Sequence, residues 1–286
     1  AAVNGSDAGV ALLRRVGDAA SSNAWQLEAP WPPPEPRSGW RSLERVSKGE
    51  FLHFSQSLLA LGQTSALGSH EVGLYDAALS PPKSLSASLG HWDFVADVCA
   101  VSAQSFASVS LDGSLLLWDL RCGLGPAAKA GFGVATPRSL CSVAASGDRL
   151  VLCGGLAGEL GLFDVRSLHE PLARPPSAAG AVVCLQLWPS GDQVVAAVAS
   201  AEEGLCSLTV GAGCGAGELQ LARYNPAPQE PRLCYDVAGG PSPWTALPGR
   251  SSVWACGNSG VTRFRAVAER LERRGRARTD PVETTT

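Results

Sequence analysis

The sequence predicts an all-β fold built from repeated antiparallel units of about 43 residues. Three segments end in an aromatic residue followed by aspartate, and these aspartates are 43 and 45 positions apart. The segments end at Tyr75-Asp76, Trp118-Asp119 and Phe163-Asp164. Cys99, Cys141 and Cys184 lie in apolar runs at matching intervals of 42 and 43 positions. The 32 glycines and 20 prolines in 286 residues supply the turns that such a fold needs.

The unit from Gly90 to Asp119 is the most complete. It begins with Gly90-His91, continues with two strands, within 94–101 and over 105–110, and closes with the tight turn Asp112-Gly113 and the apolar strand 115–119. The segments 68–76 and 158–164 are each predicted to be a turn followed by a third strand. Later units are predicted to end near 208–210 and 261–264.

This layout resembles the WD40 repeat, in which a Gly-His pair opens and a Trp-Asp pair closes each unit. The resemblance implies a WD40-type β-propeller with five recognisable blades and six or seven in total. Because a closed ring hides strand edges, residues 40–46 are expected to be the outer strand that completes the last blade.

The domain organisation follows from composition. Residues 1–39, with their proline-rich run, are expected to be a disordered segment, as either a spacer or a docking peptide. Residues 40–265 are assigned to the propeller, with an insertion over 211–243 around an outer strand at 218–224. Residues 266–286 are expected to form a basic helical tail.

The sequence offers no basis for an enzyme. Its four histidines are not paired with Cys, Asp or Glu at metal-ligand spacing, so neither a metal nor a cofactor is expected. The nine cysteines are expected to be small buried hydrophobic residues in a reducing compartment. No apolar run reaches the roughly 18 residues of a membrane helix, which predicts a cytoplasmic or nuclear protein without a membrane partner.

The polar residues of the best unit are expected to be structural. His91, Ser108 or Ser110, Asp112 and Trp118 fall where WD repeats place a buried hydrogen-bonded tetrad. There the indole, hydroxyl, imidazole and carboxylate groups satisfy one another.

Two further features suggest partners. Arg121 follows Trp118-Asp119 and Arg166 follows Phe163-Asp164, each two positions after the aspartate. Substrate receptors of cullin-RING ubiquitin ligases use a Trp-Asp-x-Arg sequence in consecutive blades to bind the ligase adaptor. In ordinary repeats the same arginine caps a strand end at the solvated rim.

The second feature is the basic run from Arg263 to Arg278, which contains Arg270, Arg273 and Arg274 among seven arginines. The net charge of the whole chain is −3, so this run leaves the remainder acidic. It is expected to be a solvated helix against the last blade, and the alternative is a contact for an acidic partner or RNA.

Residues 90–166 are similar to the WD-repeat subunits of methylosomes, through the segments 91–95, 115–122 and 161–164. The resemblance implies a non-catalytic adaptor that presents substrate to a protein arginine methyltransferase. The sequence therefore predicts a protein-binding scaffold in a multiprotein complex. The alternatives are a ubiquitin-ligase substrate receptor and an RNA-linked assembly factor.

Overall fold

The computed structural model divides into two compact units, residues 1–140 and 141–286, which are described separately. It describes residues 2–4, 10–16, 24–27, 43–51, 58–65, 69–76, 78, 83–122, 125–131, 139–147, 149–175, 177–190, 193–202, 204–211, 220–223, 234–241, 250–257 and 260–267. Strands, turns and bends make up these residues, which confirms the all-β prediction. No membrane-spanning helix occurs among them.

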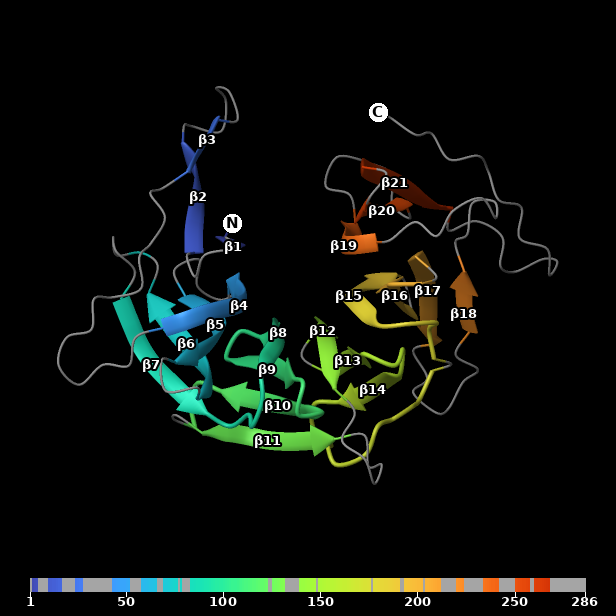
Figure 1. Cartoon of the computed structure of the whole chain (residues 1–286). Helices are drawn as coiled ribbons and strands as arrows, with labels where there is room; N and C mark the ends of the chain where they lie inside the picture. Colours follow the sequence, from blue (N-terminus) through green and yellow to red (C-terminus); the bar gives the residue numbers. More distant parts are fainter. Residues whose placement is uncertain are drawn as a thin grey trace. The chain divides into compact units, whose positions relative to one another are not determined.

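The first unit consists of antiparallel sheets whose strands follow one another in chain order (Figure 1). The first sheet contains β1 (Ala2–Asn4), β2 (Val10–Val16) and β3 (Ala24–Leu27). The second contains β4 (Leu43–Phe51), β5 (Leu58–Ser65), β6 (His70–Asp76) and β7 (Lys83–Leu89). The third contains β8 (Val95–Ser102), β9 (Ser105–Ser110), β10 (Ser114–Asp119) and β11 (Pro126–Gly131). Each strand pairs with its neighbour in sequence, so local turns build every sheet.

The second unit repeats this pattern. Its first sheet contains β12 (Leu140–Ser146), β13 (Leu150–Gly155) and β14 (Leu160–Asp164). The next contains β15 (Val182–Ser190), β16 (Gln193–Ser200), β17 (Gly204–Gly211) and β18 (Gln220–Arg223). The last contains β19 (Cys234–Pro241), β20 (Arg250–Gly257) and β21 (Gly260–Val267). Beside β14, Ala173 makes a single antiparallel bridge with Leu162 on the side away from β13.

The predicted third strands occupy the third position of their sheets. β6, β10 and β14 end at Asp76, Asp119 and Asp164, the three aspartates of the sequence repeat. The predicted later ends lie within β17 and β21, and the predicted outer strand at 218–224 contains β18. The repeat read from sequence therefore has a regular structural counterpart in strand order.

Three expectations need correction. Residues 1–39 contain β1, β2 and β3, whose pairing shows that the apolar run Val10–Val16 is a strand and not a disordered segment. Residues 43–46 belong to β4 and pair with β5, so they start a sheet and do not complete the last one. Residues 266–267 belong to β21 and pair with β20, which makes the start of the predicted helical tail a strand.

Consecutive sheets of the first unit bury apolar side chains between them. The cluster contains Ala60, Val72, Val95, Val98, Phe106, Leu116 and Trp118, which come from β5, β6, β8, β9 and β10. The rings of Phe106 and Trp118 stack with centroids 5.8 Å apart. Burying such side chains is the main driving force for packing one sheet on the next.

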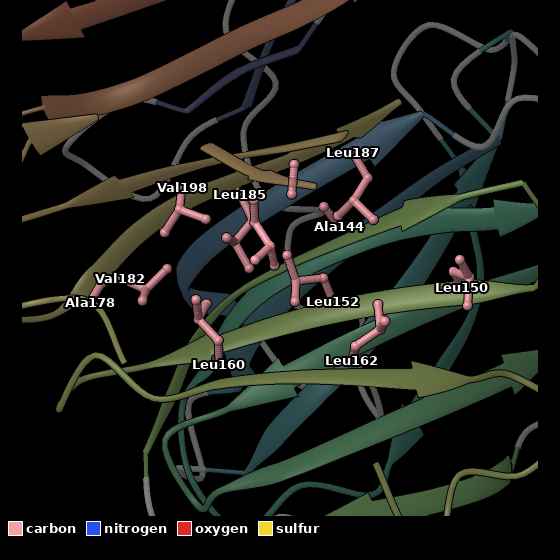
Figure 2. Close-up of a cluster of buried hydrophobic side chains, with 12 residues drawn as sticks. Ala144, Leu150, Leu152, Leu160, Leu162, Ala178, Val182, Leu185, Leu187 and Val198 are labelled. Atoms are coloured by element: carbon pink, nitrogen blue, oxygen red, sulfur yellow. The ribbon is translucent and has the colours of Figure 1, made fainter. Parts of the chain in front are cut away.

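The second unit has a matching core between the sheet of β12–β14 and the sheet of β15–β18. It contains Ala144, Leu150, Leu152, Leu160, Leu162, Ala178, Val182, Leu185, Leu187, Ala196, Val198 and Leu208. Figure 2 shows Leu152 and Leu160 facing Val182, Leu185 and Val198. In each unit, therefore, neighbouring meanders share one apolar layer.

Candidate functional site

The candidate site is centred on His91, in the loop between β7 and β8. Its imidazole is buried, and both ring nitrogens lie within hydrogen-bond distance of serine hydroxyls. Nε2 is 2.7 Å from Ser108 Oγ, and Nδ1 is 2.9 Å from Ser114 Oγ. β9 provides Ser108 and the start of β10 provides Ser114, so one side chain ties the loop to two strands.

The surrounding donors fix the direction of each bond. The indole N–H of Trp118 donates to Ser108 Oγ at 2.8 Å. Ser114 Oγ is 2.5 Å from Asp112 Oδ1, and its proton goes to that carboxylate because an ionised carboxylate only accepts. Ser114 therefore accepts from Nδ1–H of His91, and Nε2 accepts from Ser108. A neutral imidazole protonated on Nδ1 satisfies the whole chain, which we call the polar cluster: Trp118, Ser108, His91, Ser114 and Asp112.

Asp112 is the acceptor at the end of the polar cluster. Oδ2 accepts the backbone N–H of Trp92 at 2.7 Å, and Oδ1 accepts the backbone N–H of Ser114 at 2.8 Å. Burial acts to raise the pKa of Asp112, but His91 and these hydrogen bonds outweigh it and hold the pKa below its usual range. His91 Nδ1 is 3.7 Å from Oδ2, which is too long for a hydrogen bond, so the neutral imidazole acts on this carboxylate through the dipole of its Nδ1–H bond.

The structure brings together His91, Ser108, Asp112 and Trp118, the four side chains of the predicted tetrad. It selects Ser108 over Ser110, because Ser110 Oγ instead donates to the carbonyl of Asp93 at 2.9 Å. Sequence reasoning missed Ser114, which stands between His91 and Asp112. Its signal was the Asp-Gly-Ser sequence, in which an aspartate can bond the backbone two positions on.

The sheets that come before and after this one in the chain have other residues at the positions equivalent to Ser108 and Trp118. Ser108 of β9 is opposite Leu116 of β10, two residues before Trp118. In β13 and β14 the equivalents are Cys153 and Phe163, and in β5 and β6 they are Leu61 and Tyr75. Phe163 has no N–H to donate, unlike Trp118, and the thiol of Cys153 takes the place of the Ser108 hydroxyl. The indole donor and its hydroxyl acceptor are therefore both replaced in the sheet of β12–β14.

Two buried groups at these equivalent places have raised pKa values. Burial, assisted by the charge of Glu159, raises the pKa of the Cys153 thiol, so the thiol is the stable form. Burial also raises the pKa of Tyr75 to about 12, although its hydroxyl donates to Gln63 Oε1 at 2.7 Å. Neither group is suited to act as an anionic nucleophile.

Beside the buried polar cluster lies an exposed aromatic side chain, Trp92, of which 85% is accessible to solvent. The loop that carries it is held by several hydrogen bonds. The backbone N–H of Trp92 donates to Asp112, the carbonyl of Asp93 accepts from Ser110, and the carbonyl of Phe94 accepts the N–H of Leu111 at 3.0 Å. The polar cluster therefore holds the Trp92 backbone while its indole lies at the surface.

Arg121 and Arg166 occupy equivalent turns after β10 and β14. In each turn the arginine N–H donates to Oδ1 of the aspartate two residues earlier, at 2.9 Å. A third copy occurs after β6, where Ala78 N–H donates to Asp76 at 2.9 Å. These bonds end the third strand in the same way in three sheets.

Both guanidinium groups contact their own turn. Arg121 makes a two-point contact with Asp119, with Nε–Oδ1 at 2.9 Å and an Nη–Oδ2 distance of 2.6 Å. This contact, with the arginine backbone N–H, lowers the pKa of Asp119 to about 2. Arg166 Nε is 3.3 Å from Asp164, which also binds Arg149. The backbone N–H of Arg166 is the main cause of the lowered pKa of Asp164. The side chains of Arg121 and Arg166 are 70% and 68% exposed.

The remaining predicted residues are the arginines of the basic run and the cysteines. Arg270, Arg273 and Arg274 lie outside the described residues. Cys99, Cys153 and Cys184 are buried as expected, whereas Cys141 is half-buried and Cys122 is exposed. Within the described ranges, no three His, Cys, Asp or Glu residues are grouped so that they could bind a metal ion.

Comparison of the chain with models of known protein families and with curated proteins finds no significant match. The resemblance to WD repeats thus depends on the residues and geometry given above.

Proposed function

We propose that this chain is a WD40-type β-propeller that works as a non-catalytic scaffold for other proteins. The observation that supports the proposal most is that one strand arrangement recurs along the chain. Successive antiparallel meanders of three or four strands end their third strand at Asp76, Asp119 and Asp164 with the same aspartate-capped turn. The polar cluster adds the buried Trp, Ser, His and Asp side chains expected of a WD repeat.

A scaffold role suits this architecture for a physical reason. The sheet of β8–β11 is fixed by local pairing and shares an apolar layer with the sheet of β4–β7, and hydrogen bonds hold the loop 90–94 in a constant position on it. A rigid loop loses little conformational entropy when a partner binds. Trp92 provides an exposed aromatic side chain of the kind that dominates binding energy at protein interfaces.

The specific version that we propose is a cofactor of a protein arginine methyltransferase, like the WD-repeat subunits of methylosomes. Residues 90–166, which carry that similarity, include the polar cluster and the turn of Arg121. In this role the chain presents substrate and contributes no catalytic side chain. His91 agrees with this, because both ring nitrogens are engaged within the fold.

A second candidate is a substrate receptor of a cullin-RING ubiquitin ligase. The observation that favours it is the matched geometry of Arg121 and Arg166, both exposed and both two residues after a strand-ending aspartate. Against it, each guanidinium already contacts an aspartate of its own turn, and a partner would have to share or replace that contact. Solvent-exposed ion pairs of this kind contribute little to stability, so replacement by a partner contact is energetically feasible.

Affinity purification with quantitative mass spectrometry tests these assignments. The tagged full-length chain is purified from cells that express it naturally, beside the Arg121→Ala/Arg166→Ala double variant. The scaffold proposal predicts the same methyltransferase-containing assembly with both forms. Recovery of a ligase adaptor with the natural chain, and its loss from the double variant with an unchanged melting temperature, would establish the receptor instead. Lys129→Ala is the control, since it removes another exposed basic side chain from the unit that contains Arg121.

A further inference from the structure

We propose that Trp92 is a docking site for a basic protein segment, with a Lys or Arg side chain of the partner placed on the indole ring. This inference depends on the proposed scaffold role and specifies the chemistry of one contact. Trp92 is the most exposed large apolar side chain among the described residues, at 85%, and the next, Leu89, is 56% exposed.

The loop geometry shows that this exposure is built into the fold. The Trp92 backbone N–H is held by Asp112, and Asp112 is in turn held by Ser114. Asp93 and Phe94, the next two residues, are fixed to Ser110 and Leu111. An indole displayed on such a loop binds without the cost of ordering the backbone.

The charges around the ring indicate the partner. Asp93 is exposed next to Trp92 in the chain, and Asp112 accepts the Trp92 backbone N–H, so two carboxylates belong to the loop that displays the indole. The face of an indole attracts cations, and nearby carboxylates strengthen that attraction. The same carboxylates repel phosphate groups, which disfavours nucleic acid and anionic lipid as occupants.

Two apolar side chains of β7 precede the Trp92 loop in the chain. Leu85 and Leu89 lie on this edge strand, and both are more than half exposed. Leu89 is three residues before Trp92. A segment that places apolar residues beside its basic residue therefore fits this surface better than a purely basic one.

The first test is selection from a phage-displayed library of random 12-residue peptides against the full-length chain. Parallel selections use Trp92→Ala and, as a matched control, Leu156→Ala, which removes a 52% exposed side chain from the other unit. We expect the natural chain and Leu156→Ala to enrich peptides with Lys or Arg beside apolar residues, and Trp92→Ala to lose this enrichment. No enrichment of basic peptides, or the same enrichment with Trp92→Ala, would overturn the inference.

Fluorescence anisotropy then measures one enriched, labelled peptide and its norleucine-substituted form. We expect Trp92→Ala to raise the Kd about tenfold and norleucine to have a similar effect, with the two changes not additive. Asp93→Asn is expected to weaken binding about threefold and to reduce its salt dependence. Tighter binding of a labelled oligothymidylate than of the peptide, dependent on Trp92, would contradict a protein partner.

The outcome is separable from that of the proposed function. If an assembly is recovered with the natural chain and remains intact with Trp92→Ala, and no basic peptide is selected, this inference fails while the scaffold proposal stands. If no assembly is recovered but the binding of basic peptides requires Trp92, the peptide site is supported and the scaffold proposal fails. A circular dichroism melt of Trp92→Ala should match that of the natural chain, because the substituted side chain is exposed.

Discussion

At His91, both ring nitrogens are committed to hydrogen bonds within the fold, and the side chain is only 1% exposed. A general acid or base must exchange a proton with a substrate, which requires access to one of these nitrogens. The directions of the bonds also leave one neutral tautomer that satisfies Ser108 and Ser114 together. The geometry therefore assigns His91 to stability.

Substituting Asp112 tests the polar cluster. Asp112→Ala removes the acceptor of the Ser114 hydroxyl and of two backbone N–H groups. The two Ser114 bonds are partly buried and the Trp92 bond is exposed, so water can replace only part of what is lost, and we expect the free energy of unfolding to fall by about 1–2 kcal/mol. Urea denaturation measures this change, and an unchanged unfolding midpoint would show that the cluster does not stabilise the fold.

The pH dependence of stability should reveal the same carboxylate. Because the folded-state pKa of Asp112 is depressed, its stabilisation is fully present above the unfolded pKa of about 4 and is lost as pH falls through the folded value. The stability difference between the natural chain and Asp112→Asn should therefore shrink as pH is lowered below about 4. A difference that stays constant from pH 7 to pH 2 would contradict this assignment.

Exchanging the Ser-Trp pair for the Cys-Phe pair of the next sheet tests whether donor and acceptor act as one unit. Trp118→Phe leaves Ser108 without its indole donor, and Ser108→Cys leaves the Trp118 N–H with a weak acceptor. We expect each single variant to lose about 1 kcal/mol and the double variant to lose less than their sum. Chemical denaturation of the four proteins gives the coupling, and strict additivity would refute it.

At the scale of the element, the turn before β14 depends on a glycine. Gly158 has φ of +82°, and a Cβ there would lie 1.9 Å from the Ala178 carbonyl oxygen. Gly147 also has a positive φ, +61°, but no heavy atom lies within 4 Å of its Cβ position. We therefore expect Gly158→Ala to lower the stability most, Gly147→Ala to lower it by about 1 kcal/mol, and Gly125→Ala to leave it almost unchanged. Thermal melts measure these changes. Equal losses of stability at Gly158 and Gly147 would show that the Ala178 carbonyl does not approach position 158 so closely.

Strand positions were the part of the fold that sequence could predict. The segment 105–110 and the ends at Asp76, Asp119 and Asp164 were identified because turn residues and apolar runs recur at a fixed interval. The N-terminal strands were missed because Val10–Val16 lies outside that repeat, and its pairing with β1 and β3 is not encoded in local spacing. Residues 43–46 were misassigned because ring closure was argued without knowledge of the β4–β5 register.

The polar cluster could be predicted from sequence where side-chain chemistry alone limited the possible hydrogen-bonding partners. Few groups could satisfy a buried Trp118, His91 and Asp112, so the tetrad could be proposed from spacing. The role of Ser114 could not, because it depends on the fold placing Ser114 Oγ 2.9 Å from His91 Nδ1 and 2.5 Å from Asp112 Oδ1. The exposure of Trp92 was also missed, since an aromatic residue beside a strand is usually buried.

Over the whole molecule, the repeated β architecture is the feature on which the proposed binding role depends. The structure describes sheets that repeat one strand order, with a buried polar cluster in one sheet and exposed side chains at its loops. Stability and recognition are assigned to different residues: His91, Ser108, Ser114 and Asp112 hold the loop, and Trp92 presents its indole. Variants of the first group should lower stability, whereas Trp92→Ala should change binding alone.

The proposed function requires the chain to be a stoichiometric subunit of a larger protein assembly. Native mass spectrometry of the tagged full-length chain, purified under mild conditions from cells that express it naturally, tests this most directly. We expect a complex of fixed composition that contains a methyltransferase and keeps the same subunits with the Arg121→Ala/Arg166→Ala variant. Recovery of the chain only at its own mass would contradict the proposed scaffold role.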